Sequence, residues 1–169
     1  MKKIASFEKV SFERFSADRE ASFCQSGEKI IDIYNSIKLP KRATKGSAGY
    51  DFFLPENLSL GCGETVKIPT GIRCRMEDGW VLKIYPRSGL GFKYRLQLDN
   101  TVGIIDSDYY FSDNEGHIMI KITNDGHQGK NIELAKGSGF AQGIFVEFGI
   151  TFDDEAEETR NGGFGSTAV

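Results

Sequence analysis

Short runs of β-branched and aromatic residues, each closed by turn residues, fill most of this chain and limit the folds open to it. Clear examples cover residues 65–68, 80–85, 117–122 and 143–148. Such residues favour strands, and the glycine, asparagine, aspartate and proline between the runs favour turns. The 20 glycines also suit a protein that joins many short strands by turns. The pattern predicts an all-β protein, a sandwich or a barrel.

Alternation within the third run predicts which side chains are buried. Successive side chains of a strand point to opposite faces, so Ile118, Ile120 and Ile122 should share the core face. His117 falls on the other face, and we therefore expect its side chain to point toward solvent.

The length and composition predict one soluble domain over residues 1–169. A chain of 169 residues can bury one substantial core, and 39% hydrophobic, 12% aromatic and 27% charged residues are ordinary for a globular protein. Two segments differ from the rest. Residues 17–37 look like an inserted, partly helical segment that Gly27 interrupts, and residues 153–169 run from acidic to glycine-rich, as in a mobile arm.

Charge and cysteine content exclude several classes of protein. A net charge of -3 argues against a nucleic-acid partner, because binding to a phosphate backbone depends mainly on clustered lysines and arginines. There is no run of about 20 apolar residues and no apolar signal-peptide core, so we expect a cytoplasmic protein without membrane contact. Cys24, Cys62 and Cys74 fit neither a disulfide framework nor a zinc site, and His117 and His127 follow no metal-ligand spacing.

The stretch VGIIDSDYYF (102–111) places two carboxylates, separated by one residue, directly after an apolar run. In an extended chain Asp106 and Asp108 would share a face and repel each other. One interpretation is a turn, since Asp-Ser-Asp is common turn chemistry. The other is a carboxylate held at a site for chemistry.

Three glycine-containing segments are candidates for anion contact. PRSGLG (86–91) follows a strand, and its glycines, Arg87 and Ser88 could hold a phosphate or simply form a turn. KGSGFAQ (136–142) is not a dinucleotide fingerprint, because its third glycine comes one residue late and no βαβ unit surrounds it. RNGGFGST (160–167) lacks the lysine of a P-loop, so it is either a disordered tail or a wrap around phosphates, with Phe164 stacking on a base.

Together these segments resemble the five ordered motifs of the trimeric dUTPase family. The resemblance covers residues 37–167, and DSDY and GGFGST are its most specific elements. The motifs stand here as AGYDF (48–52), PRSGL (86–90), NTVGIIDSDY (100–109), GSGFAQ (137–142) and RNGGFGST (160–167).

The resemblance implies a distorted β jelly roll that forms a homotrimer with three shared active sites. It also implies hydrolysis of the substrate dUTP to dUMP and pyrophosphate with Mg²⁺ on the triphosphate, which limits uracil in DNA and supplies dUMP for dTMP synthesis. One subunit would supply the first, second and fourth motifs, a neighbour the DSDY segment, and the third subunit its C-terminal arm.

The family pattern also implies roles for single residues. Asp106 matches the carboxylate that activates water for attack on the α-phosphorus. No direct protein ligand of the metal is expected, with Asp51 a candidate through a bridging water. The phosphate contacts implied are Arg87, Ser88, Gly89, Gln142, Arg160, Gly165, Ser166 and Thr167. The uracil and deoxyribose contacts implied are Asn100, Gly103, Ile105, Tyr109 and Phe164.

Several positions depart from the family pattern. Residues 110–116 lengthen what we expect to be a hairpin tip, and Gly139 stands where the family usually has arginine. The inserted segment carries none of the matched residues, so we expect it to pack at the trimer surface or on a protein partner in preference to the substrate site.

Two other functions remain open at this point. A dCTP deaminase shares the fold, but it needs a proton-shuttling glutamate, and none lies between Lys83 and Asn114. A non-enzymatic β-sandwich module could instead use the arm and the inserted segment to bind another protein.

Overall fold

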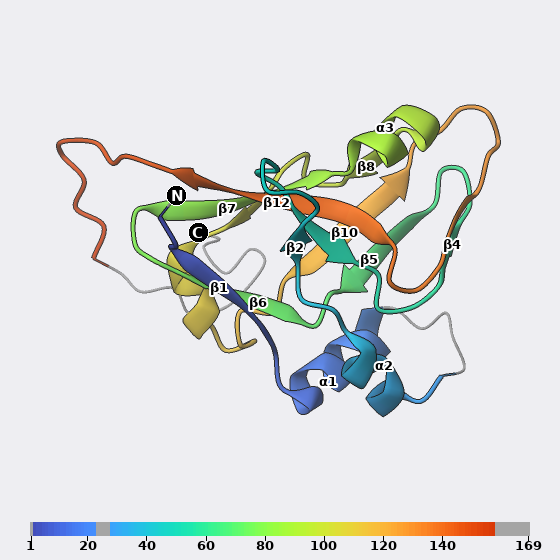
Figure 1. Cartoon of the computed structure of the whole chain (residues 1–169), viewed down its shortest axis with the longest axis horizontal. Coiled ribbons are helices and arrows are strands. Elements are labelled where there is room, and N and C mark those ends of the chain that lie inside the picture. The colour runs from blue at the N-terminus through green and yellow to red at the C-terminus, as the bar shows by residue number, and fades with distance from the viewer. Residues whose placement is uncertain (1, 23–27, 158–169) are drawn as a thin grey trace.

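The computed structural model of the chain describes residues 2–22 and 28–157, and strands dominate it (Figure 1). This confirms the predicted all-β class. In chain order the elements are β1 (Ala5–Lys9), α1 (Phe12–Ser22), α2 (Ile30–Ser36), β2 (Lys41–Arg42), β3 (Tyr50–Phe53), β4 (Leu58–Leu60), β5 (Thr65–Pro69), β6 (Ile72–Met76), β7 (Trp80–Pro86), α3 (Ser88–Tyr94), β8 (Leu96–Leu98), β9 (Gly103–Ile105), the 3-10 helix η1 (Ser107–Phe111), β10 (Met119–Asn124), β11 (Ile132–Leu134) and β12 (Gly139–Glu147).

The strands pair antiparallel, and most of them pair with partners far away in the chain, as in a jelly roll. The largest sheet has the order β2-β3-β12-β7-β9, and a second has the order β5-β10-β8. The pairs β1-β6 and β11-β4 complete the sandwich. Strand β12 is the longest and lies between β3 and β7, so it joins two of the sequence motifs directly.

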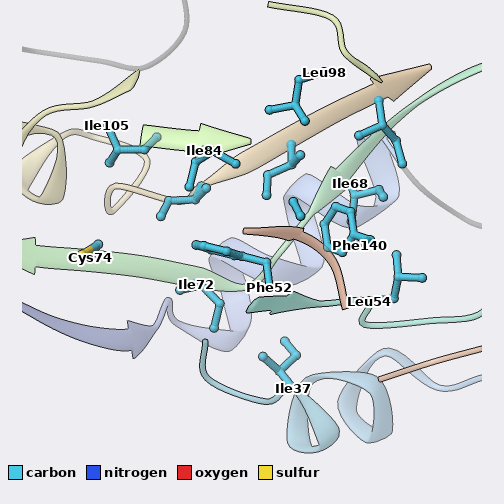
Figure 2. Packing of buried hydrophobic residues seen from close by; sticks show 14 of the residues in the cluster. Ile37, Phe52, Leu54, Ile68, Ile72, Cys74, Ile84, Leu98, Ile105 and Phe140 are labelled. Atoms are coloured by element: carbon cyan, nitrogen blue, oxygen red, sulfur yellow. The ribbon is translucent and has the colours of Figure 1, made fainter. Parts of the chain in front are cut away.

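Apolar side chains from the sheets form one core (Figure 2). Phe52, Leu82 and Phe140 are fully buried there, and Ile84 and Ile105 are nearly so. Each such side chain contributes about 1.5–3 kcal/mol when it is fully buried. Ile118, Ile120 and Ile122 are also buried, which confirms the shared face predicted for them.

Two helices occupy the predicted insertion and lie beside the strands (Figure 1). The segment is partly helical as predicted, but α1 begins at Phe12, earlier than position 17. Ser11 supplies the reason, because its hydroxyl accepts a hydrogen bond from the Arg14 N–H at 3.1 Å and so caps the helix. Phe15 of α1 and Ile33 of α2 are fully buried. The helices therefore belong to the core and pack on their own chain.

A buried ion pair anchors α1 to the sandwich. The Arg19 guanidinium meets the Glu56 carboxylate with two hydrogen bonds, of 2.7 and 2.8 Å. The two side chains are 4% and 0% exposed. Because removing one member of such a pair leaves a charge in the interior, the pair holds the helix firmly in place.

Two predictions about the segment before β10 are wrong. His117 is fully buried, because β10 begins at Met119 and strand alternation does not extend to it. Residues 110–116 are not a hairpin tip, since β9 pairs with β7 whereas β10 pairs with β5 and β8. The segment instead crosses from one sheet to another.

No helix in the described ranges has the length and apolar character needed to span a bilayer. Most of the predicted arm lies outside the described residues. Its first part, residues 153–157, is exposed and belongs to no helix or strand.

Candidate active site

Three of the five motifs meet at one end of the largest sheet. Strand β12 carries Gln142, which pairs with Asp51 of β3 on one side and with Tyr85 of β7 on the other. Arg87 follows the last residue of β7, Pro86. Strand pairing thus gathers Asp51, Arg87 and Gln142 from positions that are distant in the sequence.

Arg87 folds back over β12 to reach Asp51. Its Nε lies 3.3 Å from the Asp51 Oδ1, and its Nη1 donates to the Gly139 carbonyl at 3.4 Å. A Cβ on residue 139 would lie only 2.7 Å from that Nη1. The glycine that replaces the family's usual arginine therefore leaves room for Arg87 to lie against the strand. With the Arg87 side chain 44% exposed, the guanidinium also remains open to an anion.

Gln142 and the start of α3 complete this end of the sheet. The Gln142 side-chain amide donates to the Pro86 carbonyl at 3.1 Å, which holds it beside the second motif. Helix α3 begins at Ser88, and its first backbone bonds run from Leu90 and Gly91 to the Arg87 carbonyl. The N–H groups of Ser88 and Gly89 come before the first of these bonds. They therefore have no acceptor within the helix and can donate to a ligand.

Asp106 lies at the other end of β7. Strand β9 pairs Ile105 with Leu82 and Gly103 with Ile84, and Asp106 follows Ile105. Asp106 is therefore level with Val81, six residues along β7 from Arg87, which amounts to about 20 Å at strand spacing. Within one chain the predicted base and the predicted phosphate contacts do not form one site.

The carboxylates of DSDY do not lie along one strand. Strand β9 ends before Asp106, and η1 contains Asp108, so the pair sits at a strand-to-helix turn. This matches the turn interpretation of Asp-Ser-Asp for local structure. It also places the half-buried Asp106 directly after β9.

Tyr109 is held rigidly in η1. Its ring is only 4% exposed, and its hydroxyl donates to the His117 carbonyl at 2.8 Å. The Asn114 side-chain amide donates to the same hydroxyl at 2.7 Å. A ring fixed by packing and by two hydrogen bonds suits a wall that excludes a larger ligand.

The residues predicted for uracil lie on and before β9. Gly103 and Ile105 are buried, and a Cβ at Gly103 would lie 3.0 Å from the Ile84 Cβ. Asn100 is exposed in the turn that precedes β9. The absence of a side chain at Gly103 therefore lets β9 lie close against Ile84 of β7.

The predicted arm contacts are Arg160, Phe164, Gly165, Ser166 and Thr167, and all of them lie outside the described residues.

The sequence interpretation missed the surroundings of Tyr109, because it placed His117 in solvent. Gly116, which precedes His117, was the available signal for a turn there.

Of the described cysteines, Cys62 is exposed and Cys74 is buried, and burial raises the pKa of the Cys74 thiol to about 12. Neither thiol belongs to the clustered motifs.

Comparison with known proteins points to one family. The family model for dUTPase matches residues 35–168. The deoxyuridine 5′-triphosphate nucleotidohydrolase of Lactococcus lactis is 41% identical over 148 residues, which cover 85% of this chain and 97% of the relative. The enzyme of the same name from Paraburkholderia xenovorans is 42% identical over 147 residues, or 82% of this chain and 95% of the relative.

Solved structures agree with this result. The dUTPase of Streptococcus mutans is 38% identical with a TM-score of 0.60, covering 67% of this chain and 88% of that one. The dUTPase of Staphylococcus bacteriophage 80alpha has a TM-score of 0.63 and covers 99% of this chain and all of its own, but at 22% identity it supports the fold alone. From its motifs, its sheet order and these relatives, the chain belongs to the dUTPase family.

Proposed function

We propose that this chain hydrolyses dUTP to dUMP and pyrophosphate at sites shared between subunits of a homotrimer. The observation that carries the proposal is the clustering of Asp51, Arg87 and Gln142 at one end of β7, with Asp106 at the other end. Two relatives that are 41% and 42% identical to this chain are named deoxyuridine 5′-triphosphate nucleotidohydrolases.

Asp106 acts as the general base in this proposal. Its carboxylate holds a water in line with the α-phosphorus and accepts a proton as the water attacks. A carboxylate is a weak base, but fixed geometry beside the nucleophile makes such help worth roughly 10²–10⁴-fold in rate. Its place directly after β9, whose Gly103 and Ile105 are buried against β7, supplies that geometry.

Phosphate charge is the second barrier, because a triphosphate repels an attacking anion. Arg87 offers a guanidinium to the phosphates, while Ser88 and Gly89 offer donors at the start of α3. Gln142 lies beside them. The arm adds the predicted donors Arg160, Gly165, Ser166 and Thr167.

Specificity comes from backbone and packing. The backbone from Asn100 through Gly103 to Ile105 pairs with the uracil edge, and Phe164 of the arm covers the base. The buried Tyr109 ring packs under the deoxyribose and leaves no space for a 2′-hydroxyl. An analogue that clashes or leaves a polar group unpaired is strongly disfavoured, so this design discriminates dUTP from UTP.

Mg²⁺ fits the donor set of this site as an ion that arrives on the triphosphate. No three of the described His, Cys, Asp and Glu residues come together as a metal cage. Asp51 is one carboxylate, 19% exposed, at the phosphate end of the sheet, and it could hold a metal-bound water. The ion, when bound, would neutralise phosphate charge.

The separation along β7 supports a site that is shared between subunits, as a homotrimer would provide. A residue pair about 20 Å apart in one chain can meet only across a subunit boundary. One subunit supplies Asp51, Arg87 and Gln142, and a neighbour supplies Asp106 and Tyr109. The activity, placed in the cytoplasm, would keep uracil out of DNA and provide dUMP for dTMP synthesis.

Product analysis with the purified protein tests the proposal. We expect Mg²⁺-dependent pyrophosphate release from dUTP and much slower release from dCTP, dTTP and UTP. In water labelled with oxygen-18, the label should enter dUMP and not pyrophosphate. Ammonia release from dCTP would indicate a deaminase instead, and inactivity with every substrate would favour a binding module.

A further inference from the structure

We propose that helix α1 positions Tyr109, the predicted deoxyribose wall, through hydrogen bonds to residues 115 and 117. This inference rests on the proposed function, because it assigns α1 to the discrimination between dUTP and UTP. It joins the two additions that depart from the family pattern, the inserted helix and the long segment after Tyr109. The structure bonds these two additions to each other.

His117 is the first link. The Gly71 N–H donates to its Nε2 at 2.8 Å, so that nitrogen carries no proton and Nδ1 does. Nδ1 then donates to the Asp18 carboxylate of α1, 2.6 Å away. Both ring nitrogens of this fully buried side chain are therefore engaged, and its orientation is determined. The backbone carbonyl of the same residue accepts the hydrogen bond from the Tyr109 hydroxyl.

Glu115 is the second link. Its carboxylate accepts hydrogen bonds from the Ser11 N–H at 2.7 Å and from the Ser11 hydroxyl at 2.5 Å. The next residue, Gly116, has φ +66°, and a Cβ there would lie 2.7 Å from the Tyr109 carbonyl oxygen. Only glycine allows the chain to pass so close to η1. The segment bound to the start of α1 is thus wrapped tightly around Tyr109.

The helix itself offers a fixed support. Arg19, one residue after Asp18, makes the buried ion pair with Glu56. Phe15 is fully buried, and its ring centroid lies 6.3 Å from that of His117. Asp18 therefore belongs to a helix that the buried side chains of Phe15 and Arg19 hold against the sandwich.

The consequence concerns selectivity. A wall that excludes a single hydroxyl works only if its ring stays in place, because a small displacement opens the space that the hydroxyl needs. Weakening the hydrogen bond of the Tyr109 hydroxyl should therefore reduce the discrimination between dUTP and UTP more than it slows the reaction with dUTP. Asp18, His117, Ser11 and Glu115 are positioning residues in this scheme, since none of them needs to touch the substrate.

The test compares kcat/KM for dUTP and UTP in five variants. Asp18→Ala removes the acceptor of His117, and Tyr109→Phe removes the hydroxyl but keeps the ring. We expect each change to lower the dUTP-to-UTP ratio by about tenfold, and the double variant to lower it no further, because both act on one hydrogen-bond chain. Ile33→Val, which loosens the core under the helices, and Glu20→Ala, on the exposed face of α1, should leave the ratio unchanged. An unchanged ratio in Asp18→Ala, or additive losses in the double variant, would overturn the inference.

A second measurement does not depend on turnover. The ring signals of Tyr109 in NMR spectra, assigned by their loss in Tyr109→Phe, report how fast the ring flips. We expect slow flipping in the wild type and in Ile33→Val and fast flipping in Asp18→Ala. Equal rates in the wild type and Asp18→Ala would contradict the positioning role. Wild-type inactivity on dUTP would reject the proposed function, while this measurement would still decide whether α1 holds the ring.

Discussion

Arg87 and Asp106 flank opposite ends of strand β7, because Arg87 follows Pro86 while Asp106 follows the residue paired with Leu82. The sheet therefore fixes a separation that no side-chain movement can close. If both residues serve one reaction, each site must draw them from different subunits.

This arrangement predicts complementation between two inactive variants. Asp106→Asn and Arg87→Ala should each be nearly inactive alone, since every site in either trimer lacks one group. In mixed trimers formed by co-refolding equal amounts, about a quarter of the sites receive an intact Arg87 and an intact Asp106 from different subunits. We expect roughly that share of wild-type pyrophosphate release. Mixing the folded trimers without subunit exchange is the control, and it should restore nothing.

Asp106→Asn alone separates catalysis from binding. The amide has nearly the shape of the carboxylate but cannot accept the proton of the attacking water. We expect kcat to fall by about 10²–10⁴-fold while the affinity for dUTP, measured by calorimetry, stays within a few-fold. A variant that loses affinity in step with rate would show that Asp106 binds substrate and is not the base.

Removing residues 160–169 tests the predicted arm. These residues include Arg160, Phe164 and the hydroxyls of Ser166 and Thr167, so their loss removes donors to the phosphates and the cover over the base. We expect kcat/KM for dUTP to drop by about 100-fold or more. The thermal unfolding midpoint should hardly change, because the described core ends before this segment. A truncated chain with full activity would remove the arm from the proposal.

Local sequence signals predicted much of the fold but little of the surroundings of Tyr109. The run 80–85 forms β7 with nearly the predicted bounds, because strand propensity acts over a few neighbouring residues. His117 was misplaced for the opposite reason. Its hydrogen-bond partner Asp18 lies 99 residues away in the sequence. The pattern of neighbouring residues does not predict a hydrogen bond over that separation.

The buried pair of Arg19 and Glu56 predicts a large loss of stability on its disruption. Arg19→Met removes the cation and leaves the Glu56 carboxylate in a fully buried position. We expect the free energy of unfolding in urea to fall by about 3–5 kcal/mol. Replacing both residues by methionine should cost clearly less, because no charge is then left inside. Equal losses in the single and double variants would show that the charge pair is not the source of the effect.

Acid should release α1 from the segment that holds Tyr109. Burial alone would raise the pKa of Asp18, but the hydrogen bond from His117 and the charges of Arg14 and Lys67 outweigh it and lower that pKa. Likewise, burial of Glu115 is outweighed by its bonds to Ser11 and by the charges of Arg73 and Arg14, so the pKa of Glu115 is also lowered.

A carboxyl group whose pKa is lowered on folding stabilises the fold at pH values above its unfolded pKa, and that contribution disappears as the pH falls through the folded pKa. The wild type should therefore be more stable than Asp18→Asn and Glu115→Gln by a constant margin above about pH 5. The margin should shrink below about pH 4 and vanish in stronger acid. Thermal unfolding of the three proteins between pH 7 and pH 2.5 measures it. A margin that stays the same down to the lowest pH would mean that these two carboxylates do not stabilise the docked helix through their charge.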